Sequence, residues 1–256
     1  MIFKGHFDLL KQPLDFTKTT IYSIEEGKEF IHKEYYYLNG KVIKIINYLN
    51  GVLSEYQYLN DNDFEIRFYL FEESITEKKL DSIKKISESN GIKLKENLTE
   101  IRDGKKTTVY TGTYKYSGEY LIEENYIYPD SKYIIQHNWN KDKSVCEVIH
   151  IDEPERVKYT FDKNGFLKEC LNFQYEGSVK KTEYEYKDNM LFKLIEFPHL
   201  TYKKNLIGKG LKIMGKAQFM DEIEHYYSND KLLKKEVVKD YETKEIVRET
   251  YYKYEK

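Results

Sequence analysis

Tyr159-Thr160-Phe161-Asp162-Lys163-Asn164-Gly165-Phe166-Leu167 is the stretch that decides the fold. The same order, an aromatic pair followed by turn residues and then apolar residues, returns at 35–43 as YYYLNGKVI and at 184–191 as YEYKDNML. Asn-Gly, and Asn beside Asp, tolerate the positive φ of tight hairpin turns, and the flanking residues alternate between apolar and charged with a period of two. Each copy therefore predicts an antiparallel β-hairpin.

Further copies of this unit extend the prediction along most of the chain, and they stand at 48–53, 56–62, 114–121 and 226–233. Their spacing is uneven, with 25 residues from Phe161 to Tyr186 but 41 from Tyr186 to Tyr227, which excludes a regular solenoid. We expect an all-β fold, an elongated antiparallel hairpin-repeat sheet that is single or curled, in one domain over residues 1–256. Its parts are N-terminal hairpins over 1–71, a helix within 72–91 and C-terminal hairpins over 92–256.

The composition agrees with a folded β protein. Ala217 is the only alanine, whereas the chain has 26 Tyr and 13 Phe, and aromatic residues suit a pleated, half-buried surface. Lys and Arg number 42 against 44 Asp and Glu, so the net charge of −2 gives no long-range field toward nucleic acid or an anionic membrane. The N-terminus has no basic start followed by a long apolar run, which predicts a cytoplasmic protein.

One segment carries helical signals instead. Ser74-Ile75-Thr76-Glu77 matches a capping box, Leu80, Ile83 and Ile86 follow at helical spacing, and Asn90-Gly91 stands where the helix would end. We expect a helix over about 75–89 that packs its narrow apolar stripe on the sheet.

The units Phe161-Asp162-Lys163-Asn164-Gly165 and Tyr37-Leu38-Asn39-Gly40, each followed by an apolar residue, resemble the tyrosine-aspartate (YD, Rhs-type) repeats and the related tyrosine-rich repeats of bacterial antitoxin and immunity proteins. The resemblance covers about half of the chain in scattered pieces. It implies an open or curled sheet of hairpins and a setting in bacterial toxin and antitoxin systems. The chain departs from the full Rhs pattern in being short and in keeping the Tyr-Asp pair only as Phe161-Asp162, which favours a small binder over a toxin shell.

No pattern in the sequence predicts a catalytic, cofactor-binding or metal-binding residue. The six histidines lack His-x-His and helical i, i+4 spacing. Cys146 and His150 stand four residues apart, which on a strand separates them by about 13 Å. Adjacent carboxylates on a strand point to opposite faces and do not converge.

Recognition of another protein is the remaining prediction, because the sheet has more tyrosines than its core can bury, and Tyr and Trp are enriched at interfaces. Tyr126, Tyr128 and Trp139 are candidate anchors, although a core role for Trp139 is an equal alternative. Tyr202 is a further candidate, since we expect 198–215 to be a long loop. The acidic turn with Asp152, Glu153 and Glu155 could mimic phosphate in the basic cleft of a nuclease toxin.

The leading expectation is therefore a cytoplasmic, non-enzymatic immunity protein or antitoxin that occludes the active site of a cognate protein toxin. It needs no cofactor and binds neither nucleic acid nor membrane. Two alternatives stay open. One is a structural YD-repeat scaffold or fragment of a secreted Rhs-like assembly, and the other is an enzyme of unrecognised type, which would need a concave site where distant residues such as Cys146, His150 and Asp152 meet.

Overall fold

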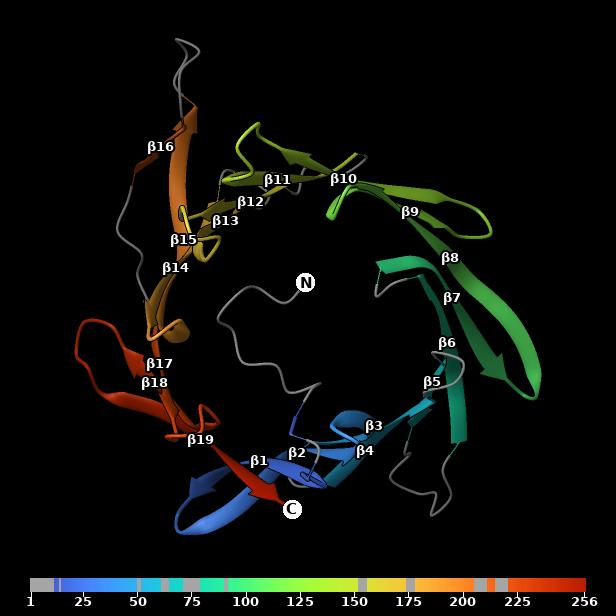
Figure 1. The fold of residues 1–256 in the computed structure, drawn as a ribbon, viewed down its shortest axis with the longest axis horizontal. Helices are drawn as coiled ribbons and strands as arrows, with labels where there is room; N and C mark the ends of the chain where they lie inside the picture. The colour runs from blue at the N-terminus through green and yellow to red at the C-terminus, as the bar shows by residue number, and fades with distance from the viewer. Residues whose placement is uncertain are drawn as a thin grey trace. The chain divides into compact units, whose positions relative to one another are not determined.

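A computed structural model of the 256-residue chain gives the architecture (Figure 1). The structure describes residues 12–13, 15–49, 52–60, 65–70, 79–89, 92–151, 156–173, 178–204, 211–214 and 221–256. Within these ranges the chain contains strands and turns and no helix. The all-β prediction is confirmed.

The strands, in chain order, are β1 (Lys18–Glu25), β2 (Lys28–Leu38), β3 (Lys41–Leu49), β4 (Val52–Asn60), β5 (Glu65–Leu70), β6 (Lys79–Ser89), β7 (Ile92–Arg102), β8 (Lys105–Ser117), β9 (Tyr120–Ile127), β10 (Lys132–Trp139), β11 (Val145–His150), β12 (Arg156–Phe161), β13 (Leu167–Phe173), β14 (Ser178–Lys187), β15 (Met190–Lys204), β16 (Leu211–Met214), β17 (Asp221–Tyr227), β18 (Leu233–Asp240) and β19 (Ile246–Glu255).

The chain divides into two compact units. The N-terminal unit comprises the described residues of Asp8–Tyr133 and Thr250–Lys256, and the C-terminal unit comprises those of Ile134–Glu249. In the N-terminal unit β1 pairs with β2 on one side and with β19 on the other, and each strand from β2 to β8 pairs antiparallel with the next one along the chain. The prediction of a single domain over 1–256 stays a prediction.

The C-terminal unit is also an antiparallel meander, in which β10 to β15 each pair with the next strand. The long strand β15 has two partners along its length, because Thr201–Lys204 pairs with β16 and Lys193–Glu196 pairs with β17. β17 then pairs with β18. Both units pair their strands in sequence because short hairpin turns join each strand to an antiparallel neighbour.

The turns form where the repeats predict them. Asn39 and Gly40 both have positive φ, 51° and 73°, and join Leu38 to its cross-strand partner Lys41. Asp188 and Asn189 do the same between β14 and β15, with φ of 52° and 63°. Two consecutive residues with positive φ make the type I′ turn, whose twist matches that of the strands it joins.

The predicted helix is wrong over the described part of its range. Residues 79–89 form strand β6, which pairs with β5 and with β7, while 75–78 lie outside the described residues. Strand periodicity places Ile83 and Ile86 on opposite faces, so the spacing of three that suggested a helical stripe puts apolar groups on both sides of the sheet. Backbone hydrogen bonds to two neighbouring strands outweigh the local helical signals.

The buried core of each unit is made by aromatic and β-branched side chains. In the N-terminal unit Tyr35, Tyr37, Val42 and Ile45 form one buried cluster. In the C-terminal unit Phe173 and Val179 form another, with Leu171 and Phe197 packed against it. Two tyrosines of the repeat units, Tyr35 and Tyr37, are therefore core residues.

Candidate functional site

Tyr126 and Tyr128 lie in a tyrosine cluster at the β8–β9 hairpin of the N-terminal unit. Both rings contact Tyr110, with centroids 5.4 Å and 5.5 Å away. Tyr114 meets Tyr126 edge to face at 6.2 Å, and their hydroxyls are 3.2 Å apart. Tyr133 packs against Tyr126 at 6.3 Å. We call these five residues the tyrosine cluster.

The cluster stands on one face of the sheet because its members keep strand register. Glu96 of β7 lies opposite Gly112 of β8, and Gly112 lies opposite Tyr126 of β9. Residues two apart on a strand share a face, which brings Tyr110 and Tyr114 to either side of Gly112. Sequence reasoning named Tyr126 and Tyr128 and missed the other three members, since their contacts depend on register.

A buried carboxylate on the neighbouring strand β7 accepts a hydrogen bond from the cluster. Glu96 is only 2% exposed, and it accepts a hydrogen bond from the Tyr110 hydroxyl at 2.9 Å. It also forms ion pairs with Lys93 and, at 3.7 Å, with Lys84. Burial alone would raise the pKa of Glu96, but the hydrogen bonds from Lys93 and Tyr110 outweigh it and hold the pKa below its usual value. The Glu96 carboxylate therefore stays ionised at neutral pH.

Three phenols of the cluster, those of Tyr110, Tyr114 and Tyr126, act as neutral hydrogen-bond donors. Burial raises the pKa of Tyr110, Tyr114 and Tyr126 above the usual tyrosine value. The Tyr126 hydroxyl donates to Glu124 at 2.7 Å. Hydrogen bonds of their hydroxyl groups thus hold the rings of Tyr110, Tyr114 and Tyr126 in place. The Tyr128 side chain remains 36% exposed.

Gly112 makes room for this arrangement. A Cβ atom there would lie 3.0 Å from Cγ of Glu96, 3.1 Å from Cε1 of Tyr126 and 3.3 Å from the hydroxyl of Tyr114. These approaches are closer than ordinary van der Waals contact. Side chains from three strands pack directly over Gly112. This close packing explains why a glycine stands here, although glycine otherwise weakens a strand.

A recurring sequence pattern, Glu-x-Tyr, could have predicted some of these tyrosine–carboxylate hydrogen bonds. Glu-x-Tyr places a carboxylate and a phenol on the same strand face, and the hydroxyl donates to the carboxylate at Glu34–Tyr36 (3.1 Å), at Glu124–Tyr126 and at Glu224–Tyr226. Glu96 carries no such signal, because its tyrosine partner comes from the next strand.

The other predicted anchors lie elsewhere. Trp139 belongs to β10 in the C-terminal unit and stacks on Phe161 with centroids 5.7 Å apart, half-buried in the sheet. Tyr202 lies in strand β15, opposite Ile213, and not in the long loop expected at this position. The roles of both residues in binding stay predictions.

The acidic turn with Asp152, Glu153 and Glu155 lies outside the described residues. Its role as a phosphate mimic stays a prediction.

The two cysteines are separated by a strand. Cys146 and Cys170 lie opposite Tyr159 from its two sides in β11 and β13, and both are free thiols. Burial raises the pKa of each thiol to about 11, so both are protonated at neutral pH. Such thiols lack the thiolate character of a nucleophile.

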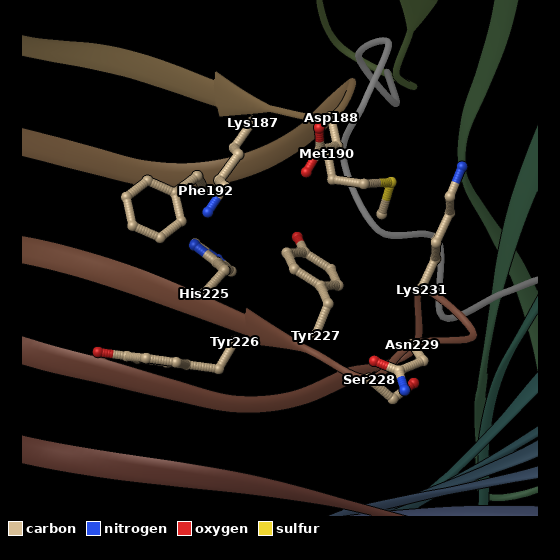
Figure 2. A pocket seen from close by; sticks show the side chains of 10 residues that line it. All are labelled: Lys187, Asp188, Met190, Phe192, His225, Tyr226, Tyr227, Ser228, Asn229 and Lys231. Carbon is tan, nitrogen blue, oxygen red and sulfur yellow. The ribbon is translucent and has the colours of Figure 1, made fainter.

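A cavity of about 610 Å³ opens in the C-terminal unit between the turns β14–β15 and β17–β18 (Figure 2). Its walls include the apolar groups of Met190, Phe192 and Tyr227. Figure 2 shows the His225 imidazole rising from β17 toward Phe192. Sequence reasoning missed this site, because its two halves come from separate hairpins and share no motif.

Among the described residues no group of three or more His, Cys, Asp or Glu side chains is arranged to hold a metal ion. The same part of the chain contains no helix that is long and apolar enough to cross a membrane.

No protein-family model matches the chain, and no curated protein matches it. Solved structures with a similar course of the chain include a porin-like protein from Bacteroides uniformis, at 8% identity and a TM-score of 0.47, covering 96% of this chain and 99% of that one. A porin-like protein from Bacteroides vulgatus follows at 12% identity and a TM-score of 0.34, covering 94% and 99%. TcdB2-TccC3-TEV has 10% identity and a TM-score of 0.26, and the match covers 93% of this chain but 16% of that one.

Proposed function

We propose that the protein is a non-enzymatic binding module, an immunity protein or antitoxin that acts in the bacterial cytoplasm by covering the active site of a cognate protein toxin. The observation that carries the proposal is the tyrosine cluster, whose rings are fixed in place while Tyr128 stays exposed. The resemblance of the hairpin units to tyrosine-rich repeats of antitoxin and immunity proteins gives the setting.

The cluster has the properties of a binding hot spot. Aromatic anchors contribute most when their rotamers are ordered before binding, because less conformational entropy is then lost. Tyr110 and Tyr126 are ordered by hydrogen bonds to Glu96 and Glu124. Tyr128 packs on Tyr110 and presents its remaining surface to solvent.

The surroundings of the cluster also suit a protein partner. Lys93 Nζ lies 4.5 Å from the centroid of the Tyr114 ring, and the Lys93 side chain is 32% exposed, so it supplies a charge beside the rings. An apolar centre with a charged rim is the usual anatomy of a protein interface.

The test is co-expression with the product of the neighbouring open reading frame, followed by purification through a tag on this chain and a growth assay. We expect a stoichiometric complex and rescue of growth. Tyr128→Ala should weaken the complex about 30-fold, as the loss of a 2 kcal/mol hot spot does, whereas Ile24→Ala on β1, also exposed, should leave it unchanged.

A chain that forms no complex and rescues no growth would refute the immunity function. A complex that forms but tolerates Tyr128→Ala would refute the position of the interface. Combined alanine substitution of Tyr126, Trp139 and Tyr202 then tests the other predicted anchors, and unchanged binding would exclude them.

A further inference from the structure

The last strand of the chain belongs partly to the N-terminal unit. Strand β19 begins in the C-terminal unit, whereas its residues from Thr250 onward belong to the N-terminal unit. There residues 251–255 of β19, red in Figure 1, pair antiparallel with residues 18–22 of β1, which is blue. The opposite edge of β1 is paired with β2 along its whole length. The end of β19 therefore occupies the one edge of β1 that β2 leaves open.

Side chains on both faces of the sheet fix β19 on this edge. Tyr251 stacks on Tyr22, with ring centroids 5.5 Å apart and an angle of 22° between the ring planes. Tyr254 stands on the other face, because it lies an odd number of residues from Tyr251, and its ring packs on Phe16 at 5.6 Å. Phe16 is only 6% exposed. Without β19, an unpaired backbone edge and these rings would face water, so the edge requires another strand of the same chemistry.

The pairing with β19 is nevertheless the weaker side of β1. It comprises five residue pairs, against eight in the pairing of β1 with β2. A further contact is the ion pair between Lys256 and Asp15 at 2.7 Å, whose side chains are 72% and 55% exposed, and exposed ion pairs contribute little in water. Few pairs and exposed contacts favour local opening at this edge, while the rest of the sheet stays paired.

We propose that this edge of β1 is a strand-exchange site whose partner is a second copy of this chain. Residues 250–256 of one copy pair with β1 of the other copy, and the reverse pairing closes a two-fold symmetric dimer. Each contact in the dimer is one that the single chain already makes, so the exchange needs no new complementary surface. The strand Ile246–Glu255 is continuous, so each copy presents the exchanged residues as a preformed strand. This surface is independent of the tyrosine cluster and of the proposed function.

The test uses two full-length variants, Thr20→Cys and Lys253→Cys, made separately. Thr20 and Lys253 lie directly opposite each other in the β1–β19 pairing, where the Cβ atoms of a cross-strand pair come within reach of a disulfide. Neither variant can form this disulfide within one chain. The two variants carry tags of different mass, are mixed and are treated with oxidised glutathione. A covalent heterodimer linked between residues 20 and 253, as mass spectrometry of its tryptic peptides shows, requires a strand from the other copy.

Pairing within one chain competes with the exchange at an effective concentration of about a millimolar, so at about 100 μM of each variant we expect about a tenth of the chains in the heterodimer. Ile24→Cys is the matched control for Thr20→Cys, because Ile24 is also on β1, is 49% exposed and lies beyond the last residue that pairs with β19. Mixed with Lys253→Cys, it should give about fivefold less heterodimer. Cys146 and Cys170 have a pKa raised by burial to about 11 and should stay reduced.

A heterodimer yield no higher than that of the Ile24→Cys control would overturn the proposal. A synthetic peptide of residues 250–256, added at roughly 2 mM, should lower the yield at least twofold, because it competes for the same edge. A yield that this peptide leaves unchanged would overturn the assignment of the edge. Urea midpoints check the fold of each variant, and if Thr20→Cys lowers its midpoint, Lys18→Cys mixed with Glu255→Cys, the next pair but one on the same face, repeats the test with the same outcomes.

Discussion

Gly112→Ala tests the packing of the tyrosine cluster with a single methyl group. At an ordinary strand position this substitution stabilises a protein by about 0.5–1 kcal/mol, because glycine loses more conformational freedom on folding. At Gly112 the new Cβ would lie 3.0 Å from Glu96 Cγ and 3.1 Å from Tyr126 Cε1. The sign of the effect depends on whether these neighbours can move.

The neighbours are held by their own contacts. Glu96 is fixed by Lys93 and by the Tyr110 hydroxyl, and Tyr126 is fixed by Glu124 and by rings on both sides. Overpacking in a fixed environment costs about 1–3 kcal/mol. After subtraction of the gain in backbone entropy, we expect Gly112→Ala to destabilise the protein by about 0.5–2 kcal/mol.

Urea unfolding followed by tyrosine fluorescence measures this change. Tyr126→Leu removes the ring carbon at 3.1 Å, so Gly112→Ala should cost less in that background than in the wild type. If Gly112→Ala stabilises the protein, or if it lowers the free energy of unfolding equally in both backgrounds, close packing is not the reason for a glycine at position 112.

Three further outcomes follow from the described contacts. Tyr110→Phe should destabilise the protein by about 1–2 kcal/mol in urea unfolding, because it removes a donor to buried Glu96, whereas Tyr226→Phe, which is exposed, should change stability by less than about 0.5 kcal/mol. The pKa values of Glu34 and Glu96 are lowered in the folded state, so their contribution is present above the unfolded value of about 4.5 and is lost as pH falls through the folded values; urea midpoints that stay flat below pH 4.5 would contradict this. Cys146 is 1% exposed and its pKa is raised to about 11, so its alkylation by iodoacetamide at pH 8 should be slow in the native protein and fast in urea, and equal rates would contradict its burial.

The hairpins were predictable because their causes are local. Asn39-Gly40 and Asp188-Asn189 adopt the positive φ that the sequence indicates, and alternation on both sides of each turn fixes strands. The tyrosine excess also pointed to Tyr126 and Tyr128, which the structure places in one cluster.

What the sequence by itself determined is the strand class and the turn positions, since each depends on residues close together in the chain. The tertiary structure alone decided that 79–89 is a strand, because its backbone partners lie on β5 and β7. It also decided the Glu96 anchor, the need for Gly112 and the His225 cavity. Those features arise from cross-strand register and from hairpins far apart in sequence, and register is set by the packing of a whole face and not by any local pattern.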